Sequence, residues 1–231
     1  MFNGFSDETF EFFMAIRFNN NRDFFQANRD WYQRAVREPC LALAEALAPT
    51  MEDIDSDLET RPWRVVSRIN RDVRFSRDKS PYRDYMWLGY RRPGVEKSGT
   101  IGLYFDLSAV HGASFGLGFY GANVPLMNAF RRRLLQDPEP MAAIWAALRA
   151  DFQLHPNTIK RMKLPEGLPE PLAVWYPLRS FYLTRALPDF ALLKSPALVD
   201  GLRSGFLRLK PVYRYFQALA PEEDAPEEFD A

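Results

Sequence analysis

The sequence predicts an α+β fold: a single antiparallel sheet of about four to five strands, covered by helices from the N- and C-terminal parts of the chain. Helical patterns occupy both ends, and the central segments alternate apolar and polar residues with short connections between them. Short connections indicate antiparallel neighbours, because a parallel pair needs a crossover of about a dozen residues or more. With 47% hydrophobic and 26% charged residues, the composition is that of a globular chain. We expect one domain over residues 1–220 and an acidic, frayed tail over 221–231.

Apolar residues that recur every three to four positions predict the helices. Ser6 is a suitable N-cap for the first helix, and the run Asn19-Asn20-Asn21 ends it and caps the next. Proline in a first turn marks the beginning of others. Helices are therefore expected over 6–18 and 22–37, and beginning near 39, 125, 138 and 195, with Pro211 kinking or splitting the last one.

Alternation of apolar and polar residues with a period of two predicts the strands. They are expected over 63–75, 85–90, 101–108 and 114–120, with a final strand over 181–184. In the first of these, Val65, Ser67 and Ile69 would lie on a mostly apolar face, opposite a charged one. Residues 155–171 contain several prolines and are expected to form a long loop.

Scarce residue types and the charge balance exclude several functions. Cys40 is the only cysteine, so a disulfide framework and a cysteine-based zinc site are excluded. With only His111 and His155, a histidine-rich metal site is excluded too, and we predict no metal and no cofactor. Thirty Lys and Arg balance thirty Asp and Glu, so the total charge favours neither nucleic acid nor a membrane as partner. The first residues show no signal-peptide pattern and no run of 18 apolar residues exists, so we expect a cytoplasmic protein. No pattern indicates an oligomeric state.

The neutral total hides a basic segment. From Arg61 to Lys97 there are eleven cations and four anions, a net charge of +7. Its densest part is RDVRFSRDKSPYR, residues 71–83. If 63–75 is a regular strand, Arg71 turns toward the apolar face and needs a carboxylate, such as Asp23 or Asp30, or a bound anion. Asp72 then faces the other side, toward Arg74 or the turn at 78–79.

This segment supplies the candidate site. The anion-binding candidates share a cationic or hydroxyl group: Arg68, Arg71, Arg74, Lys79, Tyr82 and Arg83. Asp72 and Asp78 are expected to orient these cations. Three interpretations stay open. The Arg and Asp side chains could pair with one another and pin a loop to the sheet. They could form a pocket for a small phosphate- or carboxylate-bearing ligand, with or without an enzymatic reaction, and no catalytic residue is assigned. They could also form a non-catalytic interaction surface or one for nucleic acid, which the lack of a wide basic face disfavours.

One glycine-rich run fits the dinucleotide-binding pattern G-x-G-x-x-G: Gly116-Leu117-Gly118-Phe119-Tyr120-Gly121. That site needs the glycines between a strand and a helix, where backbone amides hold a pyrophosphate. Here the glycines lie within a strand pattern, and the helix begins only near Pro125. The run is therefore expected to be a strand.

Two motifs resemble those of a known family. Asn19–Phe25 reads NNNRDFF, and 71–83 matches R-D-x-R-F-[ST]-x-D-K-[ST]-P-Y-[KR] without a gap. Both are similar to the hallmarks of a widespread, mostly bacterial family of uncharacterised proteins, filed as a domain of unknown function. Weaker blocks are Gly118-Phe119-Tyr120 with Arg131 or Arg132, and 164–167, where Glu166 stands in place of the family's usual Lys. The resemblance extends from Phe5 to about Phe216 and implies one domain, without any established activity, cofactor or catalytic residue.

Overall fold

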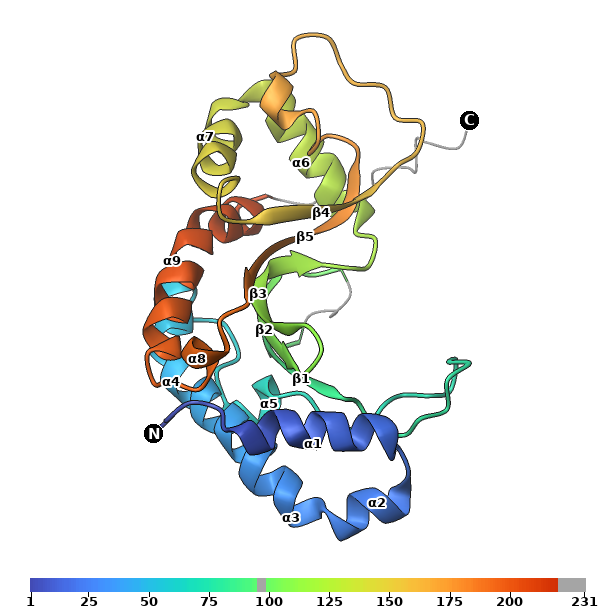
Figure 1. The fold of residues 1–231 in the computed structure, drawn as a ribbon. Coiled ribbons are helices and arrows are strands. Elements are labelled where there is room, and N and C mark those ends of the chain that lie inside the picture. The colour runs from blue at the N-terminus through green and yellow to red at the C-terminus, as the bar shows by residue number, and fades with distance from the viewer. Residues whose placement is uncertain (95–98, 220–231) are drawn as a thin grey trace. The chain divides into compact units, whose positions relative to one another are not determined.

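A computed structural model describes residues 1–94 and 99–219. Its five strands form one antiparallel sheet in the order β1-β2-β3-β5-β4 (Figure 1), which confirms the α+β class. The strands are β1 (Tyr85–Tyr90), β2 (Gly102–Ser108), β3 (Gly112–Phe119), β4 (Gln153–Thr158) and β5 (Leu178–Leu187).

The described residues divide into two compact units. The first comprises Met1–Pro93, Tyr104–Phe115 and Ala186–Phe206, and the second comprises the other described residues. The extent predicted for the domain, 1–220, stays a prediction, and the predicted tail over 221–231 lies outside the described residues.

Helices account for most of the remaining chain. They are α1 (Asp7–Phe18), α2 (Arg22–Ala27), α3 (Arg29–Tyr32), a π-helical segment η1 (Gln33–Arg37), α4 (Glu38–Ile54), α5 (Pro62–Val65), α6 (Val124–Gln136), α7 (Glu139–Leu148), a 3₁₀ turn η2 (Glu170–Leu172), α8 (Phe190–Leu193) and α9 (Leu198–Gln217). The helices expected at 6–18 and near 39, 125 and 138 are confirmed. Pro211 was expected to kink or split the last helix; it does not split it, because α9 continues through that residue.

The single helix expected over 22–37 is divided into α2, α3 and η1. Asn28 ends α2, and its side-chain Nδ2 donates to the Phe24 carbonyl at 2.9 Å. Further on, Pro39 has no N–H to donate to the Ala35 carbonyl one turn earlier. The Thr9 hydroxyl donates to that carbonyl instead, at 2.6 Å and in a buried place. A side chain of α1 thus satisfies the carbonyl that proline leaves open.

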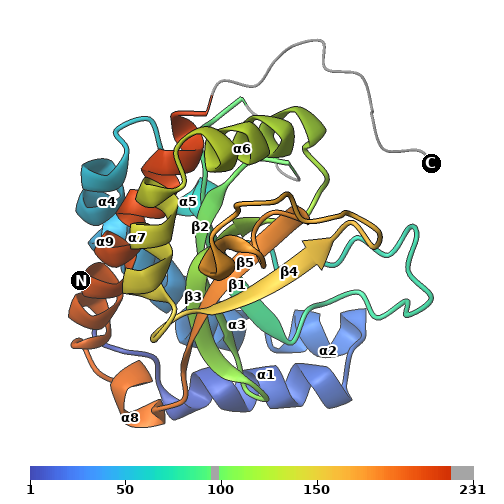
Figure 2. The same cartoon turned by 90° about the horizontal axis from the view of Figure 1, so that it is seen from above.

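The strand expected over 63–75 is wrong. Pro62 begins the short helix α5, and isolated bridges then join Val66 to Leu88 and Asn70 to Tyr82. Burial of Val65 and Ile69 fits the expected alternation, but Phe75, which should lie on the same apolar face, is 95% exposed. The segment 71–81 leaves the body as a long loop in both views (Figures 1 and 2).

Local hydrogen bonds explain why a ladder does not continue past Asn70. The backbone N–H of Arg74 donates to the Asp72 carboxylate at 3.2 Å, and that of Ser80 donates to Asp78 at 2.9 Å. Such turns offer the backbone an alternative to strand pairing. Pro81 has no N–H for the ladder in any case.

The structure adds a strand that the sequence pattern does not indicate. β4 begins at Gln153 and overlaps the first residues of the segment expected as a loop, including His155. It pairs antiparallel with β5, from Gln153 opposite Thr184 to Thr158 opposite Leu178. β4 is the last strand in the sheet order, its residues are mostly exposed, and it contains Pro156. Edge strands tolerate proline and need no buried face, so the sequence of β4 does not alternate between apolar and polar residues. The other expected strands are confirmed, and the glycine-rich run lies in and just after β3.

Aromatic rings fill the core of each unit. In the first unit Phe5 stacks on Phe105 with 6.2 Å between ring centroids. In the second Phe130 stacks on Phe216 at 4.8 Å. Cys40 is fully buried in α4, and burial raises the pKa of its thiol to about 12. Among the described helices, none combines the length and apolar character needed to cross a membrane.

Candidate anion-binding site

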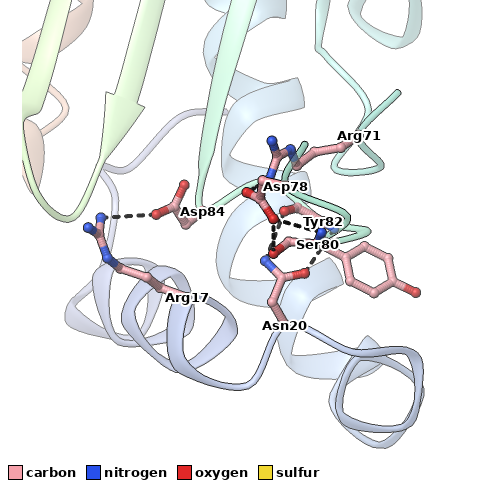
Figure 3. Close-up of polar contacts among 7 residues, drawn as sticks. All are labelled: Arg17, Asn20, Arg71, Asp78, Ser80, Tyr82 and Asp84. Atoms are coloured by element: carbon pink, nitrogen blue, oxygen red, sulfur yellow. Dashed lines mark hydrogen bonds and ion pairs between the residues drawn. The ribbon is translucent and has the colours of Figure 1, made fainter. Parts of the chain in front are cut away.

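The two sequence motifs meet in the first unit, although Asn20 and Tyr82, which join them, are 62 residues apart in the chain. Asn20, just after α1, faces the backbone of Tyr82 (Figure 3). Its Nδ2 donates to the Tyr82 carbonyl at 2.9 Å, and its Oδ1 accepts from the Tyr82 N–H at 3.0 Å. One amide side chain thus satisfies the backbone N–H and C=O of Tyr82, which the bridge to Asn70 does not use.

The neighbouring residues of the first motif strengthen this junction. The Asn21 side chain caps α2 by accepting from the Phe24 N–H at 2.9 Å. The capped turn places Phe25 against Tyr82, with ring centroids 4.3 Å apart and planes inclined by 23°. Tyr82 is only 5% exposed. The asparagine run and the Pro-Tyr pair therefore act as one structural junction.

Within the loop 71–81, most charged groups contact one another. Arg71 pairs with Asp78, which also accepts from the Ser80 hydroxyl at 2.6 Å. Arg74 pairs with Asp72 at 2.6 Å, as expected for Asp72, and Lys79 donates to the Val73 carbonyl at 2.9 Å. These contacts within the loop hold its charged side chains in defined positions.

Arg71 differs from its expected role. It was expected on an apolar strand face with Asp23, Asp30 or an anion as partner, but it lies in the loop and its partner is Asp78. Its side chain is 27% exposed, so it is not a buried guanidinium. The error follows directly from the strand that does not form.

The loop contacts shift two pKa values. The Arg74 guanidinium, followed by the Arg74 N–H, lowers the pKa of Asp72 to about 2. Arg71, followed by Ser80, holds the pKa of Asp78 well below its usual range. Hydrogen bonds to a charged carboxylate favour the charged form. Both Asp side chains are therefore ionised wherever the protein is folded near neutral pH.

Arg83 organises the segment that precedes the loop. Its Nη1 donates to the carbonyls of Arg68, at 2.6 Å, and of Asn70. Its guanidinium lies 4.6 Å from the centroid of the Trp87 ring. These bonds hold residues 68–70 in place, with Ile69 buried and Arg68 and Asn70 exposed.

Tyr82 lines two pockets. The loop pocket has a volume of about 360 Å³ and is lined by Arg17, Asn20, Arg71, Asp78, Ser80, Tyr82, Arg83, Asp84 and Tyr85. Each of its cations is already engaged, since Arg17 pairs with Asp84 at 3.1 Å and the other two bind Asp78 and backbone carbonyls. Figure 3 shows the Tyr82 ring pointing away from Asp78 and Ser80.

The second, which we name the arginine pocket, has a volume of about 470 Å³. Its lining residues are Phe25, Gln26, Arg29, Tyr32, Gln33, Arg37, Arg68, Ile69, Asn70 and Tyr82. Three are arginines and none is acidic. Of the residues that the structure describes, no Asp or Glu pairs with Arg29, Arg37 or Arg68. Helical residues 25–37 supply one wall and residues 68–70 supply another.

One arginine of this pocket contacts a tyrosine. Burial raises the pKa of the Tyr32 hydroxyl, and the hydrogen bond from Arg37 opposes that rise. Tyr32 is 4% exposed, so Arg37 is anchored at a buried phenol. Arg29 and Arg68 are exposed, and their guanidinium groups have no hydrogen-bond partner among residues 1–94 and 99–219.

The structure divides the candidate residues into three groups. Arg68 and Tyr82 line the arginine pocket, while Arg71, Asp78, Arg83 and again Tyr82 line the loop pocket. Arg74, Lys79 and Asp72 line neither pocket. Sequence reasoning missed Arg29 and Arg37. A sequence pattern could have pointed to these two arginines: Arg29, Gln33 and Arg37 are spaced four residues apart and therefore lie on one face of a helical segment that is otherwise rich in aromatic residues.

The weaker downstream block lies in the second unit. Arg131 is buried and donates to the carbonyls of Tyr176 at 3.0 Å and Leu178 at 2.7 Å. Burial lowers the pKa of this guanidinium. Its contacts fasten α6 to the start of β5, which is a structural role.

The described part of the chain contains no cluster of three His, Cys, Asp or Glu that could hold a metal ion. The chain has no match among curated proteins or among solved structures. A family model described as a conserved hypothetical protein, DUF2461, matches residues 8–215. That range includes nearly all of α1 and of α9 together with both motifs, and the chain belongs to this family of conserved hypothetical proteins.

Proposed function

We propose that the chain binds a small phosphate- or carboxylate-bearing molecule in the arginine pocket, with Arg29, Arg37 and Arg68 as its cations. One observation carries the proposal: three arginines line the same pocket and no described carboxylate pairs with them. A guanidinium stays protonated at any physiological pH, so their mutual repulsion persists until an anion offsets it. Its planar set of donors suits carboxylate and phosphate oxygens.

The loop pocket supports this choice by contrast. Its arginines have Asp78, Asp84 or backbone carbonyls as partners, so an anion there must first displace an internal contact. The nucleic-acid alternative receives less support. Of the exposed cations at the loop, Arg74 and Lys79 bind other loop atoms, and Arg77 alone has no described partner. One free cation does not make a phosphate-tracking surface.

Thermal unfolding with inorganic phosphate and with citrate tests the proposal. A ligand at a hundred times its Kd stabilises the folded state by ~2.7 kcal/mol. For a chain of this length that corresponds to a Tm increase of roughly 5–11 °C. Arg29→Ala and Arg68→Ala should each remove most of this increase and leave the ligand-free Tm almost unchanged, since both side chains are exposed and unpaired among described residues.

Arg34→Ala is the matched control. Arg34 lies in the same helical segment, is exposed and pairs with Glu8 at 2.8 Å, outside the pocket. It should keep the full ligand response. An unchanged Tm with both anions would refute the proposal. Oligonucleotide binding that weakens steeply from low to high salt, and that Arg77→Ala reduces, would favour the nucleic-acid alternative instead. The predicted cytoplasmic location stays a prediction.

A further inference from the structure

We infer that the ligand of the arginine pocket is a phosphate monoester with a polar organic part, bound as the dianion. This inference rests on the proposed function and narrows its ligand class. Three features of the pocket carry it: the number of unpaired cations, the volume, and a set of unused amide side chains. Each bears on a different part of the ligand.

The first feature is charge. The lining holds three guanidinium groups and no acidic side chain. A carboxylate would offset one positive charge and leave two unpaired. A phosphate monoester carries about −1.5 to −2 at pH 7 and offers three acceptor oxygens. Arginine recognises such oxygens with two parallel hydrogen bonds, so a dianion can engage Arg29, Arg37 and Arg68 together.

The second feature is size. The pocket has a volume of about 470 Å³, and a water molecule takes ~30 Å³ of liquid volume. A phosphate group of roughly two to three times that size leaves most of the pocket empty. The volume lies in the range of roughly 300–1,000 Å³ typical of pockets for organic ligands. The bound molecule therefore carries an organic part.

The third feature describes that organic part. Three amide side chains line the same pocket, those of Gln26, Gln33 and Asn70. None of the three has a hydrogen-bond partner within the described part of the chain. Each amide offers two donors and an acceptor. Hydroxyl groups or ring nitrogens match such a wall, whereas a purely aliphatic or aromatic group would leave those amide groups without partners. The organic part is polar.

Binding measured by calorimetry separates the ligand classes. The probes are inorganic phosphate, glucose 6-phosphate, adenosine monophosphate and gluconate, at pH 7.5 and pH 5. We expect one of the two monoesters to bind at least tenfold more tightly than phosphate or gluconate. The second pKa of a phosphate monoester is about 6, so the dianion fraction falls roughly tenfold over this pH range. Monoester affinity should fall by the same factor.

The residues that line the pocket include none of the types that ordinarily titrate between pH 5 and pH 7.5. The ionisable groups that line the pocket are Arg29, Arg37, Arg68, Tyr32 and Tyr82, and the lining contains no histidine or carboxylate. Arginine and tyrosine titrate far above pH 7.5. A fall in monoester affinity at pH 5, with gluconate affinity unchanged, therefore reports the protonation of the phosphate.

Variants assign the two parts of the ligand. Gln26→Ala and Asn70→Ala, both at exposed positions, should weaken monoester binding about three- to tenfold and leave phosphate binding unchanged. Arg68→Ala should abolish both, and Arg34→Ala should alter neither. Gluconate binding as tight as the monoesters and independent of pH would overturn this inference while the proposed function stands. No binding of any probe would overturn both.

Discussion

Replacing Asn20 by alanine tests whether the two family motifs form one structural junction. The substitution removes both hydrogen bonds to the Tyr82 backbone, at 2.9 and 3.0 Å. A hydrogen bond contributes about 0.5–1.5 kcal/mol net, and an unsatisfied buried partner raises the loss. Tyr82 is 5% exposed, so its two backbone groups gain little solvation in return. We expect a loss of about 2–3 kcal/mol, which is a Tm decrease of roughly 4–12 °C for a chain of this length.

Urea unfolding of Asn20→Ala beside Asn19→Ala measures this loss. Asn19 is the adjacent residue, is exposed, and its side chain makes one local bond to the Ala15 carbonyl at 3.0 Å. Its replacement should lower the free energy of unfolding by under ~1 kcal/mol. Because Tyr82 lines both pockets, Asn20→Ala should also weaken anion binding in the folded protein. Equal losses for the two variants would refute the junction.

Two further predictions use the loop and the last helix. NMR titration should give a pKa of about 2 for the Asp72 carboxylate, and Arg74→Ala should return this pKa toward 3.8. Because folding lowers the pKa, the contribution of Asp72 to stability is present above pH ~4 and is lost as the pH falls through the folded-state pKa. In α9, Gly201→Ala should stabilise the protein by ~0.5–1 kcal/mol, because the new Cβ meets no atom within 4 Å. Gly205→Ala should destabilise it by ~1–3 kcal/mol, because the new Cβ would lie 2.3 Å from the Phe115 ring. Urea unfolding that gave a change of the same sign for both variants would contradict the packing described here.

The fold class could be predicted because apolar residues recur with the period of a helix or a strand wherever one face of the element is buried. The strand predictions failed in segments that are mostly exposed. Burial alternates along β1 and over most of β2, so the period of two reaches the sequence there. β3 is buried along nearly its whole length, and its sequence alternates because Phe115, Leu117 and Phe119 are interleaved with glycines. β4 is exposed along most of its length and carries no such pattern. The segment after Ile69 alternates by accident: Val73 and Phe75 continue the spacing, yet Phe75 is 95% exposed. Asx-type bonds at Asp72 and Asp78 form the loop there.

The candidate site residues stay a prediction, and the sequence reached the proposed arginine pocket only in part. Charge density drew attention to the segment that contains Arg68 and Tyr82, two of the residues that line this pocket. Arg29 and Arg37 could not be joined to it from sequence alone, since the spacing within η1 and the Asn20–Tyr82 junction decide which helical face meets residues 68–70. A helical row of polar residues is ordinarily solvated, and only the fold shows what it faces.

The residues of the two sequence motifs and the cations without an acidic partner are largely different sets, and this difference has a physical reason. Asn20, Asp78, Ser80 and Arg83 use their polar groups on one another or on the backbone, so they fix the course of the chain. A group satisfied in that way has little left for a ligand. The arginine pocket instead takes its charge from side chains beside the motif, on a scaffold that the motif holds in place. The motif therefore supports the proposed site chiefly by positioning Tyr82 and residues 68–70.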